Sequence, residues 1–268
     1  MAPPDYFEYE RRLWGVAVLP LLERAGVSLA RARVLDVGCG HGGMLAALSA
    51  TWPGAQCVGI DIDPEMIADA ERRAGGAARF ARADLFGFDD GRDRSGGGGG
   101  FDAVFLRDVL EHVPRASDAV RRALDLLRPG GVAFLSYAPF YSPFGGHQHN
   151  GVGAASWVPW LQLLPEGVFR RVVRCEGNAY KSRESLQADI DAVLATRLTL
   201  AAMRRTLATL DATVLLRERY LVRPDYRIKF SLPTVRLPAR TIPLLSELLC
   251  TAEALILRKP SRNDSPAA

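Results

Sequence analysis

The stretch VLDVGCGHGG, residues 34–43, decides the fold of this chain. Around its first half, RVLDVGC (33–39) is apolar and β-branched, which predicts a buried strand. The helical pattern GMLAALSATW (43–52) follows, and Pro53 and Gly54 end it. The glycines between strand and helix let the backbone turn tightly and approach a bound molecule closely. Such a turn is typical of small-molecule sites at the carboxyl edge of an open parallel sheet.

Strands and helices alternate on both sides of this stretch. Further strands are predicted at 56–62, 78–84, 101–108, 132–139, 212–222 and 253–260, and helices at 6–30, 64–73, 115–131, 184–210 and near 240–251. The tract DRSGGGGG (93–100) predicts a flexible surface loop. The alternation favours an α/β fold with a Rossmann-like, doubly wound, mainly parallel sheet of seven strands.

The composition fits one large soluble domain. The chain has 268 residues, 48% of them hydrophobic and 24% charged, and its net charge is +4. Arg far outnumbers Lys, but the charges are scattered, so we expect Arg204, Arg205 and 217–223 to form solvated faces rather than to bind nucleic acid. Four distant cysteines, with no signal pattern and no membrane-spanning run, predict a cytoplasmic protein. Nothing in the sequence indicates its oligomeric state.

Acidic residues end the next two predicted strands. Asp61 follows the glycine loop at a spacing at which a carboxylate can accept both hydroxyls of a ribose. Asp84 ends the third strand, where it can receive an adenine amino group. No Lys-Ser/Thr pair follows the glycines, so nothing is arranged to hold a triphosphate. This combination favours an uncharged adenosine derivative over a nucleotide.

Five segments in 33–137 together resemble the motifs of class I S-adenosylmethionine (SAM)-dependent methyltransferases: VLDVGCGHGG, VGIDIDPEMI, ARADLFGF, FDAVFLRDVLEHVP and LRPGGVAFLS. The resemblance implies SAM as cofactor, S-adenosylhomocysteine (SAH) as product, and a set of cofactor-binding residues. These are Asp36, Gly38 and Gly40 around the methionine part, Asp61 with Ile62 at the ribose, Asp84 with Leu85 at the adenine edge, and Leu106 with Arg107 through their backbone at the methionine part.

The segments outside these motifs choose the methyl acceptor. Residues 139–183 are aperiodic and rich in Pro, Gly and aromatic residues, so we expect a lid whose order depends on ligand. The expected organisation is an N-terminal helical cap (1–30), a SAM-binding core (31–138), a lid and acceptor-binding insertion (139–211), a C-terminal completion of the sheet (212–260) and a disordered tail (261–268). The aromatic residues of the capping segments either line an acceptor pocket or pack the lid onto the sheet: Tyr6, Trp14, Phe140, Tyr141, Phe144, Trp157 and Trp160.

Two histidines in SPFGGHQHN (142–150) follow the strand that ends over the carboxyl edge. Neutral imidazole is a suitable base near pH 7, and Gly145 and Gly146 would permit the turn that aims His147 inward. The segment also resembles one in a subset of bacterial methyltransferases, whose histidine matches His147 and not His149. We therefore expect His147 to act as the base or to position the acceptor, with His149 ranked behind it. The alternative is that these histidines only lock a loop.

A metal site is a further alternative. Some ubiquinone-pathway and small-RNA methyltransferases carry Glu-x-x-Glu-His after the fourth strand and bind a divalent metal. That resemblance implies Mg, Mn or Zn at Asp108, Glu111 and His112, and His147 could close the site. In many other members of the class, Leu-Glu-His binds no metal and the histidine faces the acceptor pocket, so we expect His112 across the pocket from His147.

Methyl transfer to a small-molecule acceptor is therefore the expected function, with O-methylation preferred because a basic histidine is available. Two alternatives stay open. The first is metal-assisted methylation of RNA or of a quinone precursor, although the chain lacks the basic and aromatic strip of an RNA-binding surface. The second is a SAM-binding fold repurposed as a non-methylating enzyme or a regulator.

Overall fold

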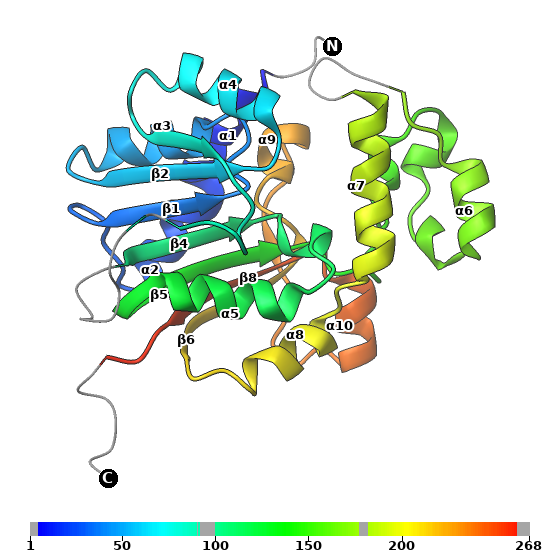
Figure 1. Ribbon diagram of the computed structural model, residues 1–268. Coiled ribbons are helices and arrows are strands. Elements are labelled where there is room, and N and C mark those ends of the chain that lie inside the picture. The colour runs from blue at the N-terminus through cyan, green and yellow to red at the C-terminus, as the bar shows by residue number, and fades with distance from the viewer. Residues whose placement is uncertain (1–4, 90, 92–99, 177–181, 262–268) are drawn as a thin grey trace.

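A single mixed sheet forms the centre of the computed structural model, which describes residues 5–89, 91, 100–176 and 182–261 (Figure 1). Most of the glycine tract and almost all of the predicted tail lie outside the described residues. The strand order is β3-β2-β1-β4-β5-β8-β6-β7. The strands are β1 (Arg33–Val37), β2 (Gln56–Asp61), β3 (Arg79–Arg82), β4 (Phe101–Arg107), β5 (Leu127–Tyr137), β6 (Thr213–Val222), β7 (Val235–Arg236) and β8 (Ala252–Arg258).

The predicted fold class is confirmed, since β3, β2, β1, β4 and β5 are parallel neighbours with helices on both faces (Figure 1). The sheet has one strand more than the predicted seven, because the two-residue β7 pairs with β6 at the edge. The helices are α1 (Tyr6–Leu13), α2 (Leu19–Arg24), α3 (Gly43–Thr51), α4 (Pro64–Arg73), α5 (Ala116–Leu126), α6 (Glu166–Val172), α7 (Arg183–Thr196), α8 (Leu200–Leu207), α9 (Tyr226–Phe230) and α10 (Pro243–Leu249). Short helical turns are η1 (Trp14–Val18), η2 (Leu110–His112), η3 (Gln148–Asn150), η4 (Ala154–Trp157) and η5 (Leu161–Leu163).

Alternate residues of the central strands enter two separate cores. Leu35 and Leu135 pack with α5 and α8 on one face, whereas Val34 and Phe134 pack with α2 and α3 on the other. A strand buried on both faces must be apolar throughout, which is why these strands are near-continuous apolar runs in the sequence.

The strand register brings the motif residues to one edge. Val37 of β1 pairs with Ile60 of β2 and with Leu106 of β4. The residues that follow these strands therefore meet at the carboxyl edge, where the lid and α7 also lie (Figure 1). A small-molecule site is therefore expected at this edge.

The antiparallel part of the sheet encloses a buried charge. Glu253 of β8 is fully buried and accepts hydrogen bonds from Nε of Arg217 and Nε of Arg219, each at 2.8 Å, and from the Tyr137 hydroxyl at 2.6 Å. The predicted solvated face over residues 217–223 is therefore wrong in part. The two arginines point inward because their positive charges compensate the buried negative charge of Glu253 on the neighbouring strand.

Two predicted helices are interrupted. The helix expected over 6–30 passes through the π-helical turn η1 and ends at Arg24. The helix expected over 184–210 is two helices, because Arg197 adopts a left-handed conformation (φ 45°) and ends α7. Thr199 then begins α8 by accepting a hydrogen bond from the Ala202 N–H.

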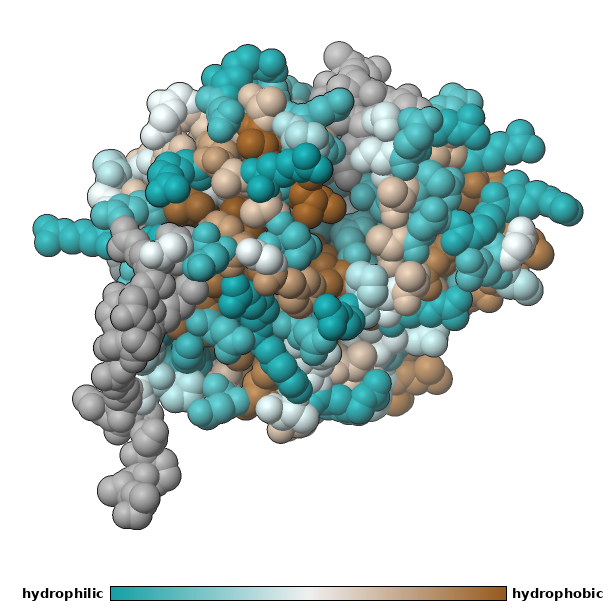
Figure 2. Space-filling view, in the orientation of Figure 1, coloured by the Kyte–Doolittle hydropathy of each residue, from teal (hydrophilic) through white to brown (hydrophobic). Residues whose placement is uncertain are grey.

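The segment between β5 and α8 has a small core of its own, formed by Phe140, Phe169, Val173, Cys175, Leu186, Ile190, Val193 and Leu194. Its α7 packs beside η2 at the carboxyl edge of the sheet (Figure 1). The described helices include none long and apolar enough to cross a bilayer. Figure 2 shows a mainly hydrophilic face with apolar surface near α10, where Ile242, Leu244 and Leu245 are exposed.

Candidate active site

The glycine loop after β1 has the geometry that its sequence predicts. Gly38, Gly40 and Gly42 all have positive φ angles, of 69°, 54° and 79°, which favour glycine. A Cβ atom on Gly38 would lie 2.5 Å from Cγ2 of Val109, so the loop also needs glycine for close packing. Asp36 beneath the loop is 3% exposed, and burial raises its pKa well above the usual value.

Glu10 of α1 is a component of this loop that the sequence did not reveal. Its Oε2 accepts a hydrogen bond from the Gly43 N–H at 2.9 Å, and Oε1 accepts one from the His41 N–H at 3.3 Å. The Gly43 N–H is the first of α3 and the His41 N–H lies in the loop just before it, so Glu10 caps that helix from a different helix. A Cβ on Gly43 would lie 2.1 Å from the Phe7 carbonyl oxygen, so this glycine lets α1 approach the loop. In sequence, Glu10 belongs to the charged run ERR, which is typical of a solvated helix face.

Asp61 lies at the end of β2 beside the glycine loop. Its Oδ2 accepts a hydrogen bond from the Gly40 N–H and its Oδ1 accepts one from the Asp63 N–H, both at 3.0 Å. A carboxylate has about four acceptor positions, so two remain for the hydroxyls of a ribose. The neighbouring Ile62 is 68% exposed and offers apolar surface at the same edge.

The end of β3 carries the expected adenine-side residues. Asp84 is exposed, and its Oδ1 accepts a hydrogen bond from the Phe86 N–H at 2.8 Å. Leu85 is buried, whereas Phe86 is 37% exposed. Polar acceptors on Asp61 and Asp84, together with exposed apolar side chains, suit a ribose and a flat base, so the described residues fit the adenosine part of SAM.

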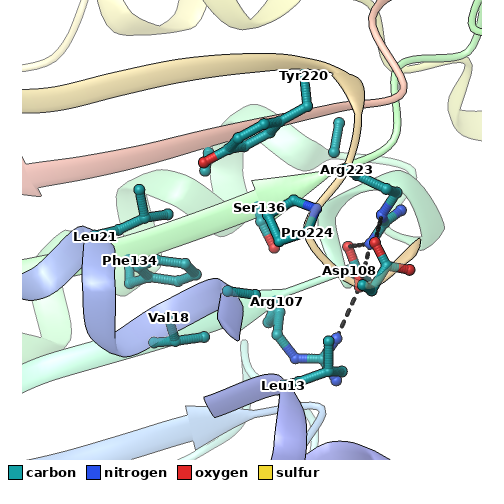
Figure 3. Close-up of a pocket in the computed structure, with 14 residues that line it drawn as sticks. Leu13, Val18, Leu21, Arg107, Asp108, Phe134, Ser136, Tyr220, Arg223 and Pro224 are labelled. Atoms are coloured by element: carbon teal, nitrogen blue, oxygen red, sulfur yellow. Dashed lines mark hydrogen bonds and ion pairs between the residues drawn. The ribbon is translucent and has the colours of Figure 1, made fainter. Parts of the chain in front are cut away.

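Asp108 follows β4 and forms a charge cluster with two arginines (Figure 3). Leu106 is fully buried, and the Asp108 backbone has a positive φ of 54°. Arg223 donates to both carboxylate oxygens at 2.9 and 2.8 Å, and Arg107 donates to Oδ2 at 2.8 Å. Burial alone would raise the pKa of Asp108, but the charges of Arg223 and Arg107 hold that pKa below its usual value. Asp108 is therefore an ionised partner of these arginines.

A small cavity lies between the N-terminal helices and the sheet (Figure 3). Leu13, Val18 and Phe134 line it, and Arg107 and Arg223 lie at its charged end. Its volume is about 30 Å³, which suits one or two water molecules and excludes a methyl acceptor.

Glu111, His112 and His147 form a second cluster, separate from the arginine pairs of Asp108. The His112 and His147 rings are 4.9 Å apart between centroids, and ligand atoms of all three residues lie within 4.8 Å of one another. Glu111 is 2% exposed; its Oε1 accepts a hydrogen bond from the Ala138 N–H at 3.2 Å, and its buried Oε2 has no hydrogen-bond partner among the described residues. Burial, and then the Asp108 charge, raise the pKa of Glu111 to about 8.

His147 itself makes the turn into this cluster, with a φ of 56°. Gly145 and Gly146 were expected to supply that turn, but neither has a positive φ. They serve close packing instead, since a Cβ on Gly145 would lie 2.2 Å from the Phe140 carbonyl oxygen and one on Gly146 would lie 2.4 Å from Cβ of Gln162. A left-handed residue other than glycine costs free energy and is often found at a functional site.

The lid loop is locked by glutamines. Gln148 is fully buried and donates through Nε2 to the Pro143 carbonyl at 2.9 Å, while Gln162 donates to the Phe140 and Ser142 carbonyls at 2.9 and 2.6 Å. The sequence did not reveal this role, because a glutamine between two histidines is typical of a side chain that faces solvent.

His149 differs from His147 in its surroundings. Its ring centroid is 5.4 Å from that of His147, but it lies outside the Glu111 cluster and keeps solvent-exposed surface. Surrounding protein, with Lys229 and Arg223 nearby, lowers the pKa of His149 to about 4. His149 is therefore a poor base at neutral pH.

The sheet order, the glycine loop and the acid at the end of β2 define a Rossmann-like methyltransferase. Residues 6–188 match the family described as a methyltransferase domain, and the chain belongs to that family. The predictions of a class I SAM-dependent methyltransferase and of SAM as its cofactor are confirmed at the level of the family.

Curated relatives share part of the chain. An uncharacterized methyltransferase of Mycobacterium marinum is 37% identical over 128 residues, which are 47% of each chain. A ubiquinone biosynthesis O-methyltransferase of Xanthomonas oryzae is 42% identical over 113 residues, which are 42% of this chain and 45% of the relative. The chain thus spans about half the length of the curated relatives it matches.

Solved structures show the same fold at low identity. The plantazolicin methyltransferase BpumL, solved with a pentazolic desmethylPZN analog and SAH, has a TM-score of 0.55 and 14% identity, covering 95% of this chain and 84% of that one. Magnesium protoporphyrin IX methyltransferase (ChlM) from Synechocystis PCC 6803, with bound SAH, has a TM-score of 0.51 and 17% identity, covering 97% and 90%.

Proposed function

We propose that this chain transfers the methyl group of SAM to a hydroxyl oxygen of a small-molecule acceptor, with His147 as the base. The observation that carries the proposal is the position of His147. Its backbone turns left-handed beside His112 and Glu111, in a loop that Gln148 and Gln162 hold in place. The glutamine side chains thus hold the loop through its carbonyl groups, and the imidazole of His147 faces that of His112.

The cofactor would supply an electrophilic methyl group on a sulfonium. For this chain we assign Asp61 and Ile62 to the ribose, Asp84 and Leu85 to the adenine, and Asp36, Gly38, Gly40, Leu106 and Arg107 to the methionine part. Glu10 keeps the start of α3 in the conformation that presents the loop.

His147 would take the hydroxyl proton as the oxygen attacks the methyl carbon. Glu111, with a pKa of about 8, is protonated at neutral pH and can donate a hydrogen bond that orients an imidazole. His112 lies across from His147 and would hold the acceptor oxygen. The relative named as a ubiquinone biosynthesis O-methyltransferase supports an oxygen acceptor.

The test is a screen of phenols, carboxylates, sugars and amines with SAM, read as SAH release, followed by His147→Ala with the best acceptor. We expect the substitution to lower turnover by about a hundredfold or more, the usual effect of removing a general base. SAH affinity should change little, which controls for misfolding. Near-normal turnover in His147→Ala would show that the histidine is not the base.

A metal-assisted reaction is the second candidate, because three potential ligands converge. Glu111, His112 and His147 offer one oxygen and two nitrogens within 4.8 Å of one another, and the unpartnered Glu111 Oε2 is available for a cation. Two imidazoles and a carboxylate fit Mn or Zn. Asp108, which was expected in this set, lies outside it, because Arg223 and Arg107 take its carboxylate.

A bound cation would hold the acceptor oxygen and lower its pKa. Calorimetric titration of chelator-treated protein with Mn²⁺ or Zn²⁺ tests this candidate without an activity measurement. Cation binding that His112→Ala abolishes would support a metal site. Loss of SAH release in the presence of chelator would show in addition that methyl transfer depends on the metal, as expected for an RNA or quinone-precursor acceptor. No cation binding would refute it.

A further inference from the structure

The large apolar side chains that are exposed to solvent gather in two segments. Among the described residues, most of them lie in residues 152–172 of the lid or in residues 230–245, within the connection between β6 and β8. Trp157 in the lid is 74% exposed, and Leu244 and Ile242 in the connection are 68% and 64% exposed. Single exposed apolar residues are ordinary, but a gathering of them is typical of a surface that binds another body.

The two segments lie against each other. The Nε1–H of Trp160 in the lid donates a hydrogen bond at 3.2 Å to the carbonyl oxygen of Leu248 in α10. Trp160 directly precedes η5, which carries the exposed Leu163, and Leu248 lies one turn after the exposed Leu244 on α10. The lid helices and α10 also lie on the same side of the molecule (Figure 1). Residues 157–164 and 240–245 therefore form one apolar surface, the lid–α10 surface.

The chain around this surface is basic. Residues 157–164 and 226–246 contain no acidic residue, and 226–246 contain four cationic ones, namely Arg227, Lys229, Arg236 and Arg240. Arg236 pairs with Glu218, whereas Arg227 and Arg240 are exposed and have no ion pair among the described residues. Since Arg240 stands two residues before Ile242, uncompensated positive charge adjoins the exposed apolar side chains.

We propose that the lid–α10 surface binds the surface of a lipid bilayer with anionic headgroups. Leucine and tryptophan side chains can enter the boundary between headgroups and acyl chains, while arginines bind the phosphates there. A second copy of the chain fits less well, because two-fold symmetry would place the same positive charges against each other. A nucleic acid would complement the charge but would leave the exposed leucines without apolar partners.

The proposal does not depend on which molecule accepts the methyl group. The lid that forms part of the lid–α10 surface also contains His147, which lies beside His112 in the candidate active site. Binding to a bilayer would therefore bring that site to the membrane surface.

Sedimentation of the full chain with lipid vesicles tests the proposal. We expect the protein to sediment with vesicles of phosphatidylcholine and phosphatidylglycerol in equal parts, and to stay in solution with vesicles of phosphatidylcholine alone. Leu244→Ser should weaken binding to the anionic vesicles by about tenfold, because one apolar side chain no longer enters the lipid. Arg240→Gln should weaken it by about fivefold, the effect of one cation near an anionic surface.

Val214→Ser and Arg31→Gln are the matched controls. Both residues are exposed, and they lie near the starts of β6 and β1, at the opposite edge of the sheet from the lid. Both variants should therefore bind vesicles as wild type does. The four substituted side chains are all exposed, so the variants should keep the circular dichroism spectrum and the unfolding midpoint of wild type.

Three results would overturn the proposal. The first is that wild-type protein sediments with neither kind of vesicle or equally with both. The second is that Leu244→Ser binds anionic vesicles as tightly as wild type, which would leave only a charged surface for a polyanion such as a nucleic acid. The third is that light scattering without lipid shows an oligomer that Leu244→Ser dissociates, which would assign the surface to a second copy of the chain.

Discussion

Glu111→Gln should change how the stability of this protein depends on pH. Glu111 is 2% exposed, and burial followed by the Asp108 charge raises its pKa to about 8 from an ordinary value of 4.5. Because the folded-state pKa is raised, the folded protein keeps a proton that the unfolded chain releases. The stabilising contribution is therefore complete below about pH 4.5 and is lost as the pH rises through about 8.

The size of this pH effect follows from the single proton that Glu111 keeps in the folded protein and releases in the unfolded chain. Each pH unit within this window lowers the free energy of unfolding by about 1.4 kcal/mol, which amounts to about 3 kcal/mol between pH 5 and pH 7. Glutamine keeps an acceptor for the Ala138 N–H but does not titrate. Wild-type protein should therefore lose this amount relative to Glu111→Gln over the same interval.

The assay is urea denaturation in chelator at several pH values from 5 to 8, for wild type, Glu111→Gln and Glu8→Gln. Glu8 is a suitable control because its side chain is about half exposed. The free energy of unfolding of Glu8→Gln should depend on pH as that of wild type does. For Glu111→Gln it should fall less steeply with pH, by the slope that corresponds to one proton. Parallel profiles for all three proteins would refute the reasoning that burial keeps Glu111 protonated.

Two further predictions concern the sheet and the lid. Glu253→Ala should lower the free energy of unfolding by about 3–5 kcal/mol, because it leaves Arg217 and Arg219 without their buried partner. Urea denaturation beside the exposed control Glu184→Ala measures this loss, and an equal effect of both substitutions would contradict it. Residues 139–183 should be cut more slowly by trypsin when SAH and an acceptor are bound, because ligand orders the lid; equal cutting rates in every state would count against a lid that responds to ligand.

Local sequence patterns predicted the parallel half of the fold. The helix expected at 64–73 is observed as α4 with those bounds, since Pro64 and the capping Asp63 mark its start. The strand expected over RVLDVGC (33–39) is observed as β1, which ends at Val37, because the apolar β-branched run favours a buried strand and the glycine loop follows it. In both cases the deciding interactions lie within a few residues of the pattern.

Contacts between residues that are far apart in the sequence determine the parts of the site that sequence patterns did not predict. Glu10 caps a helix about thirty residues away, and Arg223 pairs with Asp108 across the sheet, so neither role has a local signature. The same reasoning applies to Gln148, whose partners are lid carbonyls. His147 was identified from the sequence as the first candidate, but its left-handed backbone was not, because glycines stood beside it.

Calorimetric titration of SAH into wild-type protein and Asp61→Ala tests where the cofactor binds. If the ribose hydroxyls bind to the two free acceptor positions of Asp61, the substitution should weaken SAH binding by about 2–3 kcal/mol. Glu65→Gln, an exposed position in the first turn of α4, should leave the affinity unchanged. Unchanged affinity in Asp61→Ala would contradict the placement of SAM at the glycine loop.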